Sequence, residues 1–298
     1  MISICIPIFN FKVAELVKEL SFQSAQLLQR SEIVLIDDGS NLEIKNANEK
    51  ICSEHTYIKL ENNIGRAAIR NKFLDYTIFN YLLFLDCDSL VSSPDFLKNY
   101  VEVIKCGKNQ LVCGGRLQQI NRPDRAHLLR WKYGNAKESK TLKERSRAPN
   151  KSFMANNFLI QRELFKKVSF DESLKGYGHE DTVFGFELNK KNISINHINN
   201  PVINGDLETN AKFILQSEKA ISNLIQLLKT RKFDRELIKQ VRLVEVYYKL
   251  YSFRNINIKI FTILSPIIKY FLTQGLISII LFDYYKLGLF SLNMEREK

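Results

Sequence analysis

The first third of the chain alternates short apolar runs with stretches in which apolar residues recur at helical spacing. Helical spacing is found over Val13 to Leu28, Ile64 to Phe79 and Pro94 to Ile104. The continuous apolar runs predict buried strands at residues 2–8, 33–36, 57–60, 81–85 and 111–113. Because such runs alternate with helices, the pattern predicts an α/β fold whose mostly parallel sheet is covered on both faces.

The pattern changes after residue 115. Residues 116–150 are polar, irregular and rich in lysine and arginine. A strand-like stretch from Phe153 to Ile160 follows, and Ile193 to Ile198 alternates like a strand. From residue 211 the chain reads as amphipathic helices. These changes divide the chain into residues 1–115, 116–210 and a C-terminal helical region, 211–298.

The last part of the chain is strongly apolar from Ile256 to Phe290, with interruptions that include Lys259 and Lys269. Its longest uncharged run, Tyr270 to Phe282, is shorter than the ~20 residues that a bilayer-spanning helix needs. Two interpretations stay open. The helices lie in a membrane interface with a basic rim, or they form a buried pair packed against the sheet domain.

Composition narrows the class of protein. Apolar residues make up 45% of the 298 positions and charged residues 26%, which is typical of a globular chain. The formal net charge of +12 favours anionic partners, but no zinc finger, aromatic RNA-reading strand or basic heptad helix is present, so we expect no nucleic-acid partner. The five cysteines form no CxxC pair, and no basic segment precedes the strand at Ile2. We therefore expect a cytoplasmic protein without a secretion signal.

Polar motifs follow three of the predicted strands. They are Asp37-Asp38-Gly39-Ser40, Asn62-Asn63-Ile64-Gly65-Arg66 and Asp86-Cys87-Asp88. Ligands of open α/β sheets bind beyond the carboxyl ends of the strands, so the three motifs should converge on one crevice. Each motif also has an ordinary structural interpretation, as turn chemistry, a helix start or a capped turn.

The chemistry of these motifs suits a nucleoside diphosphate. Asp86 and Asp88 lie two residues apart, so both carboxylates project to one side and offer the oxygen ligands that Mn²⁺ or Mg²⁺ prefers beside phosphates. Asp38 can accept hydrogen bonds from ribose hydroxyls, with Asp37 holding the base or the turn. The helix start at Gly65 and Arg66 suits an anion.

A second acidic pair, Glu180-Asp181, follows Gly176-Tyr177-Gly178. A carboxylate there can act as a general base toward a hydroxyl, or both acids can simply stabilise a helix N-terminus. His197, on the next predicted strand, would complete the metal site or serve as a structural histidine.

The order and spacing of these motifs resemble glycosyltransferase family 2 over roughly residues 1–210. The likeness rests on Pro7, Asp37-Asp38-Gly39-Ser40, Asn63-x-Gly65-x-x-x-x-Arg70-Asn71, Asp86-Cys87-Asp88 and Gly176-x-Gly178-His179-Glu180-Asp181. The resemblance implies a GT-A fold, inversion at the anomeric carbon, a divalent cation (Mn²⁺ or Mg²⁺) and a UDP-sugar donor. Residues 1–115 would be the nucleotide-sugar-binding half, and residues 116–210 the acceptor-binding and catalytic half.

The resemblance also implies roles for particular residues. Asp181 would be the base, with Glu180 as the second candidate, and Asp88 would bind the metal with Asp86 nearby. The acceptor side would include Asn156, Asn157, Tyr177 and His179. The nucleotide would contact Pro7, Phe9, Asp37, Asp38, Asn63, Gly65, Arg66, Arg70 and Asp86.

The chain departs from processive members of the family. Their Gln-x-x-Arg-Trp motif is absent after Asp181, and Arg130-Trp131 lies before it with His127 where glutamine would stand. We therefore expect single-sugar addition to a glycan or lipid-linked acceptor in cell-surface polysaccharide synthesis, with the enzyme peripheral on the inner face of the cell membrane. An inactive GT-A-like glycan-binding or membrane-scaffolding protein is the alternative. A pyrophosphorylase or dinucleotide oxidoreductase would require glycine-rich loops that are missing.

Overall fold

The computed structural model describes residues 1–107, 110–174, 176–276 and 278–297. These residues form two compact units. The first comprises residues 1–118, 139–175 and 184–206, and it contains both β-sheets. The second comprises residues 119–138, 176–183 and 207–298, and it is helical.

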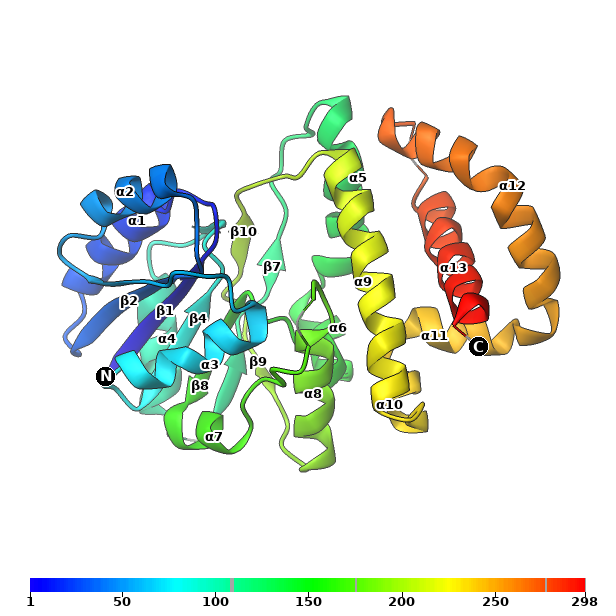
Figure 1. Cartoon of the computed structure of the whole chain (residues 1–298). Helices are drawn as coiled ribbons and strands as arrows, with labels where there is room; N and C mark the ends of the chain where they lie inside the picture. The colour runs from blue at the N-terminus through cyan, green and yellow to red at the C-terminus, as the bar shows by residue number, and fades with distance from the viewer. Residues whose placement is uncertain (108–109, 175, 277, 298) are drawn as a thin grey trace. The chain divides into compact units, whose positions relative to one another are not determined.

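The first unit is built on a seven-stranded sheet with the strand order β3-β2-β1-β4-β8-β6-β9 (Figure 1). Its first four members in this order are parallel neighbours, whereas β8 runs antiparallel to both β4 and β6. The strands are β1 Ile2–Ile8, β2 Ser31–Asp37, β3 Thr56–Lys59, β4 Tyr81–Leu85, β6 Leu111–Cys113, β8 Asn157–Gln161 and β9 Asn196–His197. The predicted mixed, mostly parallel sheet is confirmed.

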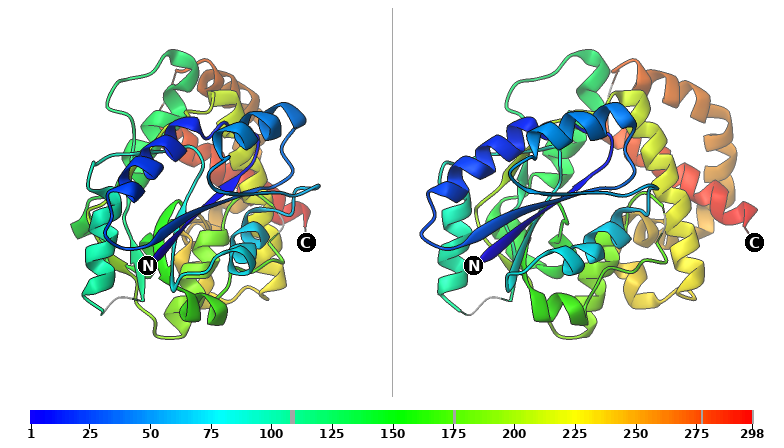
Figure 2. Two further views of the ribbon diagram at one scale, coloured as in Figure 1. Left: turned by 90° about the vertical axis from the view of Figure 1, so that its left-hand side faces the viewer. Right: turned by 60° about the vertical axis from the view of Figure 1, so that its left-hand side comes forward.

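Helices cover both faces of this sheet because its strands are apolar on both sides. Ile4 and Ile6 of β1 pack in a cluster with α1 (Ala14–Ala25) and α4 (Phe96–Lys105), whereas Cys5 belongs to the cluster on the other face. That second cluster takes side chains from α3 (Arg66–Tyr76), α7 (Arg162–Lys167) and α8 (Glu180–Lys190). Figure 2 shows α1 and α2 (Leu42–Ile51) on one side of β1 and β2, and α3 on the other.

A small second sheet lies in the same unit and orders the chain around Asp88. Its strand order is β5-β10-β7, with bounds Ser89–Val91, Val202–Asn204 and Arg116–Leu117. The backbone N–H of Gly205 donates to the carbonyl of Asp88 over 2.8 Å. The turn that carries Asp88 is therefore fixed on both sides by sheet structure. Two short helices complete the unit, α6 (Leu142–Arg147) and the 3₁₀ turn Asn150–Ser152.

The second unit is a bundle of helices whose core includes Leu129, Phe213, Phe261 and Phe282. Its short helical turns are Arg125–His127, Gly134–Glu138 and Tyr251–Phe253. The longer helices are α5 Leu128–Tyr133, α9 Asn210–Thr230, α10 Arg235–Gln240, α11 Arg242–Lys249, α12 Arg254–Thr273 and α13 Ile279–Arg296. The predicted C-terminal helical region is therefore confirmed.

Helix α12 is longer than the uncharged run in the sequence suggested. Among the residues that the structure describes, Tyr251–Thr273 is the one helical stretch long and apolar enough to cross a membrane, judged by length and composition. Only 17% of its most apolar stretch is buried. Pro266 lies inside the helix. The buried side chains of the helix are Phe261, Ile268 and Leu272. One side of α12 is thus packed and the rest is open.

Candidate active site

Asp37 holds the turn that follows β2. Its Oδ1 accepts a hydrogen bond from the backbone N–H of Ser40 at 2.7 Å, and its Oδ2 accepts one from the Tyr57 hydroxyl at 3.0 Å. Burial and then the Asp37 carboxylate raise the pKa of Tyr57 above its usual value, so the phenol stays a donor. Asp37 was predicted to hold either the base or the turn, and these two hydrogen bonds support its role in the turn.

Asp38 joins this turn to the start of α3. Its Oδ1 accepts the N–H of Ile64 at 2.7 Å, its Oδ2 accepts the N–H of Gly65 at 3.1 Å, and its carbonyl accepts from the Asn63 amide. Burial raises the pKa of Asp38, although the two backbone donors oppose that rise. The first two sequence motifs therefore meet at one point. Contact with a ribose stays a prediction.

Gly39 directly follows these two aspartates with φ +76°, and a Cβ there would lie 2.7 Å from both the carbonyl carbon of Asn62 and the N of Asn63. We expect Gly39→Ala to lower the free energy of unfolding by about 2–5 kcal/mol, from left-handed strain plus a backbone clash. Gly107 is the matched control, because its φ is +68° and its Cβ would meet nothing nearer than 4.0 Å. Gly107→Ala should cost only the strain, about 1–2 kcal/mol. Urea denaturation measures both, and equal losses would contradict the clash.

Pro7 and Phe9 lie at the carboxyl end of β1, beside Asp38, whose N–H donates to the carbonyl of Ile8 over 2.7 Å. Phe9 is 51% exposed, which is high for a phenylalanine beside a buried strand. An exposed ring at this edge offers a flat apolar surface to a nucleobase.

Arg70 connects α3 to the third motif. Its side chain is 3% exposed, and its Nη2 donates to Asp86 Oδ1 at 2.8 Å while Nη1 donates to the carbonyl of Arg66. The guanidinium also lies 5.6 Å from the centre of the Phe170 ring. Asp86 is therefore neutralised by a buried arginine, which leaves Asp88 as the more available carboxylate.

Asp88 is partly buried next to Asp86, in the turn between β4 and β5. Burial, followed by the Asp86 charge, raises the pKa of Asp88 to about 6, against the lowering effect of Arg116 and Arg66. A cation would relieve this unfavourable charge, and one or two carboxylates with phosphate oxygens form an ordinary Mg²⁺ site. The two aspartates therefore fit a divalent metal that is shared with a diphosphate.

His197 does not join that site. Its Nε2 lies 2.9 Å from the carbonyl of Pro149 and its Nδ1 lies 2.9 Å from Nη1 of Arg145, so both ring nitrogens are used within the protein. Burial lowers its pKa, and Arg145 lowers it further, against the bond to Pro149. Across the described residues, no group of three His, Cys, Asp or Glu side chains is placed to hold a metal ion. The prediction of His197 as a metal ligand is therefore wrong, and metal binding by Asp86 and Asp88 stays a prediction.

Arg145 and Arg116 were not singled out from the sequence. Arg145 is buried, and its guanidinium donates to the carbonyls of Cys113, Gly114 and Ile198 as well as to His197. Arg116 donates to the Asn204 amide oxygen and lowers the pKa of Asp88. Both lie in the basic stretch after residue 115, where neighbouring lysines and arginines give no signal that separates them.

Asn157 is a correction on the acceptor side. Its side chain is fully buried, with Oδ1 accepting from the Tyr100 hydroxyl at 2.6 Å and Nδ2 donating to the carbonyls of Gly115 and Asn200. These bonds use the amide inside the core, so Asn157 is not available to an acceptor. Its neighbour Asn156 differs, because its buried Oδ1 has no hydrogen-bond partner among the described residues. The Asn156 carbonyl accepts the N–H of Asp86 at 3.1 Å, next to the proposed metal site.

In the second unit, helix α9 holds the loop that precedes Glu180 and Asp181. Asn223 of α9 donates to the carbonyl of Tyr177 at 2.9 Å. A Cβ on Gly176 would lie 1.9 Å from Asn223 Nδ2, and one on Gly178, whose φ is +88°, would lie 3.1 Å from the Cβ of Ala220. The two glycines therefore let the loop lie flat on the helix. No motif or spacing in the sequence singles out Asn223.

The two candidate bases differ in accessibility. Glu180 is 7% exposed, whereas Asp181 is only partly buried. Asp181 Oδ1 accepts the N–H of Thr182 at 2.7 Å, and the carbonyl of His179 accepts the N–H of Val183 in the first turn of α8. Burial lowers the pKa of His179, which favours its neutral form. The exposure favours Asp181 over Glu180, and the role of base stays a prediction.

Solved structures share this fold. A mannosyltransferase from Pyrobaculum calidifontis, in complex with GDP-Man and Mn²⁺, matches with a TM-score of 0.61 at 12% identity, over 99% of this chain and 86% of that one. Glucosyl-3-phosphoglycerate synthase from Mycobacterium tuberculosis, in complex with Mn²⁺, UDP and glucosyl-3-phosphoglycerate, matches with a TM-score of 0.52 at 17% identity, over 76% and 79%. At these identities the likeness shows a shared fold, GT-A. No match was found among curated proteins.

The sequence model of glycosyl transferase family 2 matches residues 3–169, which is more than half of the chain. The matched range holds Asp38, Arg70, Asp86 and Asp88, and it ends before Glu180 and Asp181. With the motif order and the GT-A fold in agreement, the chain belongs to glycosyltransferase family 2.

Proposed function

We propose that this protein is an inverting, metal-dependent glycosyltransferase that uses a UDP-sugar. It transfers one sugar to a hydroxyl of a glycan or lipid-linked acceptor in cell-surface polysaccharide synthesis. The observation that carries the proposal is that α3 connects the motifs. Its N-cap Gly65 binds Asp38, and its Arg70 binds Asp86, which lies beside Asp88. Hydrogen-bond acceptors for a nucleoside and carboxylates for a metal–diphosphate thus lie in one unit.

The donor is held by residues of the first unit. Phe9 stacks on the base, and Asp38 accepts from the ribose with the lone pairs that Ile64 and Gly65 leave open. Arg66 and Arg116 both lower the pKa of Asp88, and their positive charges would stabilise a diphosphate there. Asp88, with Asp86, would hold Mn²⁺ or Mg²⁺, which supplies Lewis-acid stabilisation of the charge on the departing diphosphate. Mn²⁺ accompanies the nucleotides in both relatives described above.

Asp181 is the general base. Its carboxylate takes the proton of the acceptor hydroxyl, and the oxygen attacks the anomeric carbon from the face opposite the departing UDP. One displacement of this kind inverts the configuration. Asn223 and the glycines at 176 and 178 fix the loop before Asp181, so the carboxylate is preorganised.

The protein acts on the cytoplasmic side, peripheral at the membrane, where lipid-linked acceptors lie. The open apolar side of α12 supports this location. Because no processive motif follows Asp181, the enzyme adds a single sugar in each encounter.

A thermal-shift titration with UDP, GDP, CDP and TDP, each with and without Mn²⁺, tests the donor site. We expect UDP with Mn²⁺ to raise Tm by roughly 5 °C at 100 times its Kd, because ligand binding stabilises the folded state by mass action. UDP alone should give a much smaller shift, since the diphosphate then meets Asp88 without a cation. If none of the four nucleotides shifts Tm, the glycan-binding or scaffolding alternative becomes the better account.

A further inference from the structure

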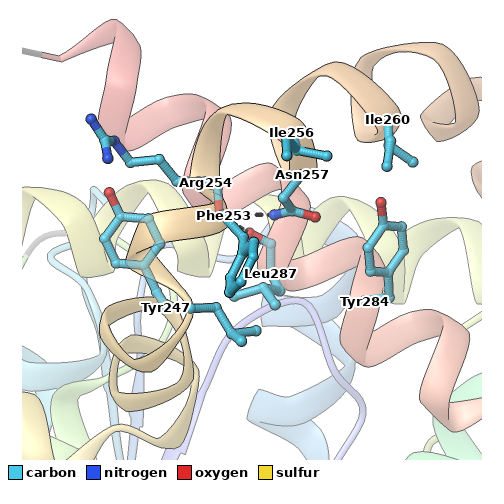
Figure 3. Close-up of a pocket in the computed structure, with 10 residues that line it drawn as sticks. Tyr247, Phe253, Arg254, Ile256, Asn257, Ile260, Tyr284 and Leu287 are labelled. Atoms are coloured by element: carbon cyan, nitrogen blue, oxygen red, sulfur yellow. Dashed lines mark hydrogen bonds between the residues drawn. The ribbon is translucent and has the colours of Figure 1, made fainter.

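Helices α11, α12 and α13 of the second unit enclose an apolar cavity of about 300 Å³ (Figure 3). Arg254 and Tyr247 lie at one end of it, and Ile260 and Tyr284 at the other. Its lining also includes Leu250, Phe253, Ile256, Asn257, Leu287 and Ser291. Asn257 Nδ2 donates to Ser291 Oγ at 3.3 Å, so this polar pair satisfies itself and the remaining lining is mostly hydrocarbon and aromatic. The volume is at the lower end of the range for ligand pockets.

The cavity opens on the exposed face of α12. Phe253, Ile256 and Ile260 line the cavity and are also 63%, 61% and 45% exposed. The same face continues along the helix with Ile263, Ile267 and Tyr270, each more than half exposed. Folded proteins rarely expose a contiguous apolar surface of this length outside an interaction site.

The charged residues of α12 itself are all basic. The stretch from Tyr251 to Thr273 contains Arg254, Lys259 and Lys269 and no acidic residue. Arg254 lies at the cavity edge with its guanidinium 4.2 Å from the centre of the Tyr251 ring, and its Nε is 3.9 Å from Glu295. Lys269 pairs with Glu218 at 2.7 Å. Lys259 is exposed and has no acidic partner among the described residues. A second copy of the chain would bring a like charge against Lys259, whereas an anionic lipid head group would complement it.

The packing of α12 restricts the orientation that the helix can take at a bilayer. Its Phe261, Ile268 and Leu272 are buried in the core of the second unit. Its neighbour α13 carries Asp283, which pairs with Lys137 and Lys286. A spanning orientation of α12 would draw these charges into hydrocarbon, so an orientation in the plane of the interface fits this packing better.

We propose that α12 lies in the surface of an anionic membrane and that the cavity takes an acyl chain of an anionic phospholipid, with Arg254 beside its phosphate. The proposal deepens the peripheral location given under the proposed function. It does not depend on sugar transfer. Exclusion of the apolar lining from water drives the binding, and the basic residues select the anionic head group.

Quenching by brominated lipids tests this with the intact chain. The protein has one tryptophan, Trp131, and Ile256→Trp adds a second at the cavity mouth. On vesicles of phosphatidylcholine and phosphatidylglycerol (7:3) with brominated acyl chains, we expect Ile256→Trp to lose at least twice as much fluorescence as wild type. Leu28→Trp is the matched control, because Leu28 is 96% exposed in the first unit, and it should show no added loss. Equal loss for both variants would overturn the proposal.

Cosedimentation with the same vesicles is an independent test of membrane binding. Ile263→Asp changes a side chain that is 73% exposed, so the fold is retained, and it should lower the vesicle-bound fraction about fivefold. Leu28→Asp should leave that fraction unchanged. Binding to anionic vesicles that Ile263→Asp does not reduce would mean charge adsorption alone and would reject the apolar contact. A dimer in gel filtration that Ile263→Asp dissolves would reassign the face to a second copy. The UDP–Mn²⁺ thermal shift on the same samples reports separately on the proposed function.

Discussion

Asp88→Asn is expected to abolish sugar transfer, by about 10³-fold or more, and to remove the Mn²⁺-dependent part of UDP binding. The substitution keeps the shape of the side chain and removes its charge. The turn should persist, because the carbonyl of Asp88, and not its carboxylate, binds the N–H of Gly205. Arg70 already neutralises Asp86, so the loss of Asp88 leaves no second carboxylate of equal strength for a cation. UDP release by activity assay and the Mn²⁺-dependent Tm shift measure the two effects.

Asp95→Asn is the matched control for this change. Asp95 lies in the same unit, at the start of α4, and its exposed side chain pairs with Lys98 at 3.2 Å. The control should keep the activity and the UDP–Mn²⁺ shift of wild type. An Asp88→Asn variant that still shows the full Mn²⁺-dependent shift would place the metal elsewhere, and the role proposed for Asp88 would then be wrong.

Much of the fold could be predicted because its strands are short apolar runs that helical stretches separate. β1, β2 and β4 each appear as continuous apolar sequence, and the structure places them as parallel neighbours. The small sheet of β5, β7 and β10 could not be predicted in this way, since its strands of two or three residues mix polar and apolar side chains and form no continuous apolar run. Their pairing depends on contacts between distant parts of the chain.

The candidate site, like the fold, could be predicted only in part. Asp38, Asp86 and Asp88 follow strands. The rule that ligands bind beyond the carboxyl ends of strands was therefore enough to predict one common site for them. Asn157 and His197 were misjudged because a polar side chain in sequence does not reveal its partners. Tyr100 and Gly115 occupy the Asn157 amide, and Arg145 and Pro149 occupy the His197 ring.

The second unit adds a physical reason for a motif that was recognised only by resemblance. Residues 176–183 belong with the helices, where Asn223 and Ala220 of α9 meet the loop. The glycines at 176 and 178 are needed for close approach to Asn223 and Ala220, which lie more than 40 residues further along the chain. A sequence pattern shows where such glycines stand, and only the fold shows what they approach.

Asp181→Asn is expected to lower transfer by about 10²–10⁴-fold and to leave the UDP–Mn²⁺ thermal shift unchanged. The amide keeps the bond from Thr182 N–H through its oxygen but cannot take the acceptor proton. The loss should therefore appear in kcat, whereas the KM for the UDP-sugar should stay near that of wild type. This split separates a missing base from a damaged donor site, which would raise KM as well.

Glu180→Gln is the control that decides between the two acids. Glu180 is 7% exposed in the first turn of α8, so its carboxylate is less available to a bound hydroxyl than that of Asp181. We expect Glu180→Gln to retain at least a tenth of the activity. If Glu180→Gln is inactive and Asp181→Asn is not, the two roles are exchanged, and the buried acid must become accessible when the acceptor binds. If both variants stay active, the proton leaves by another route, and the single-displacement mechanism loses its base while the donor site of the first unit still stands.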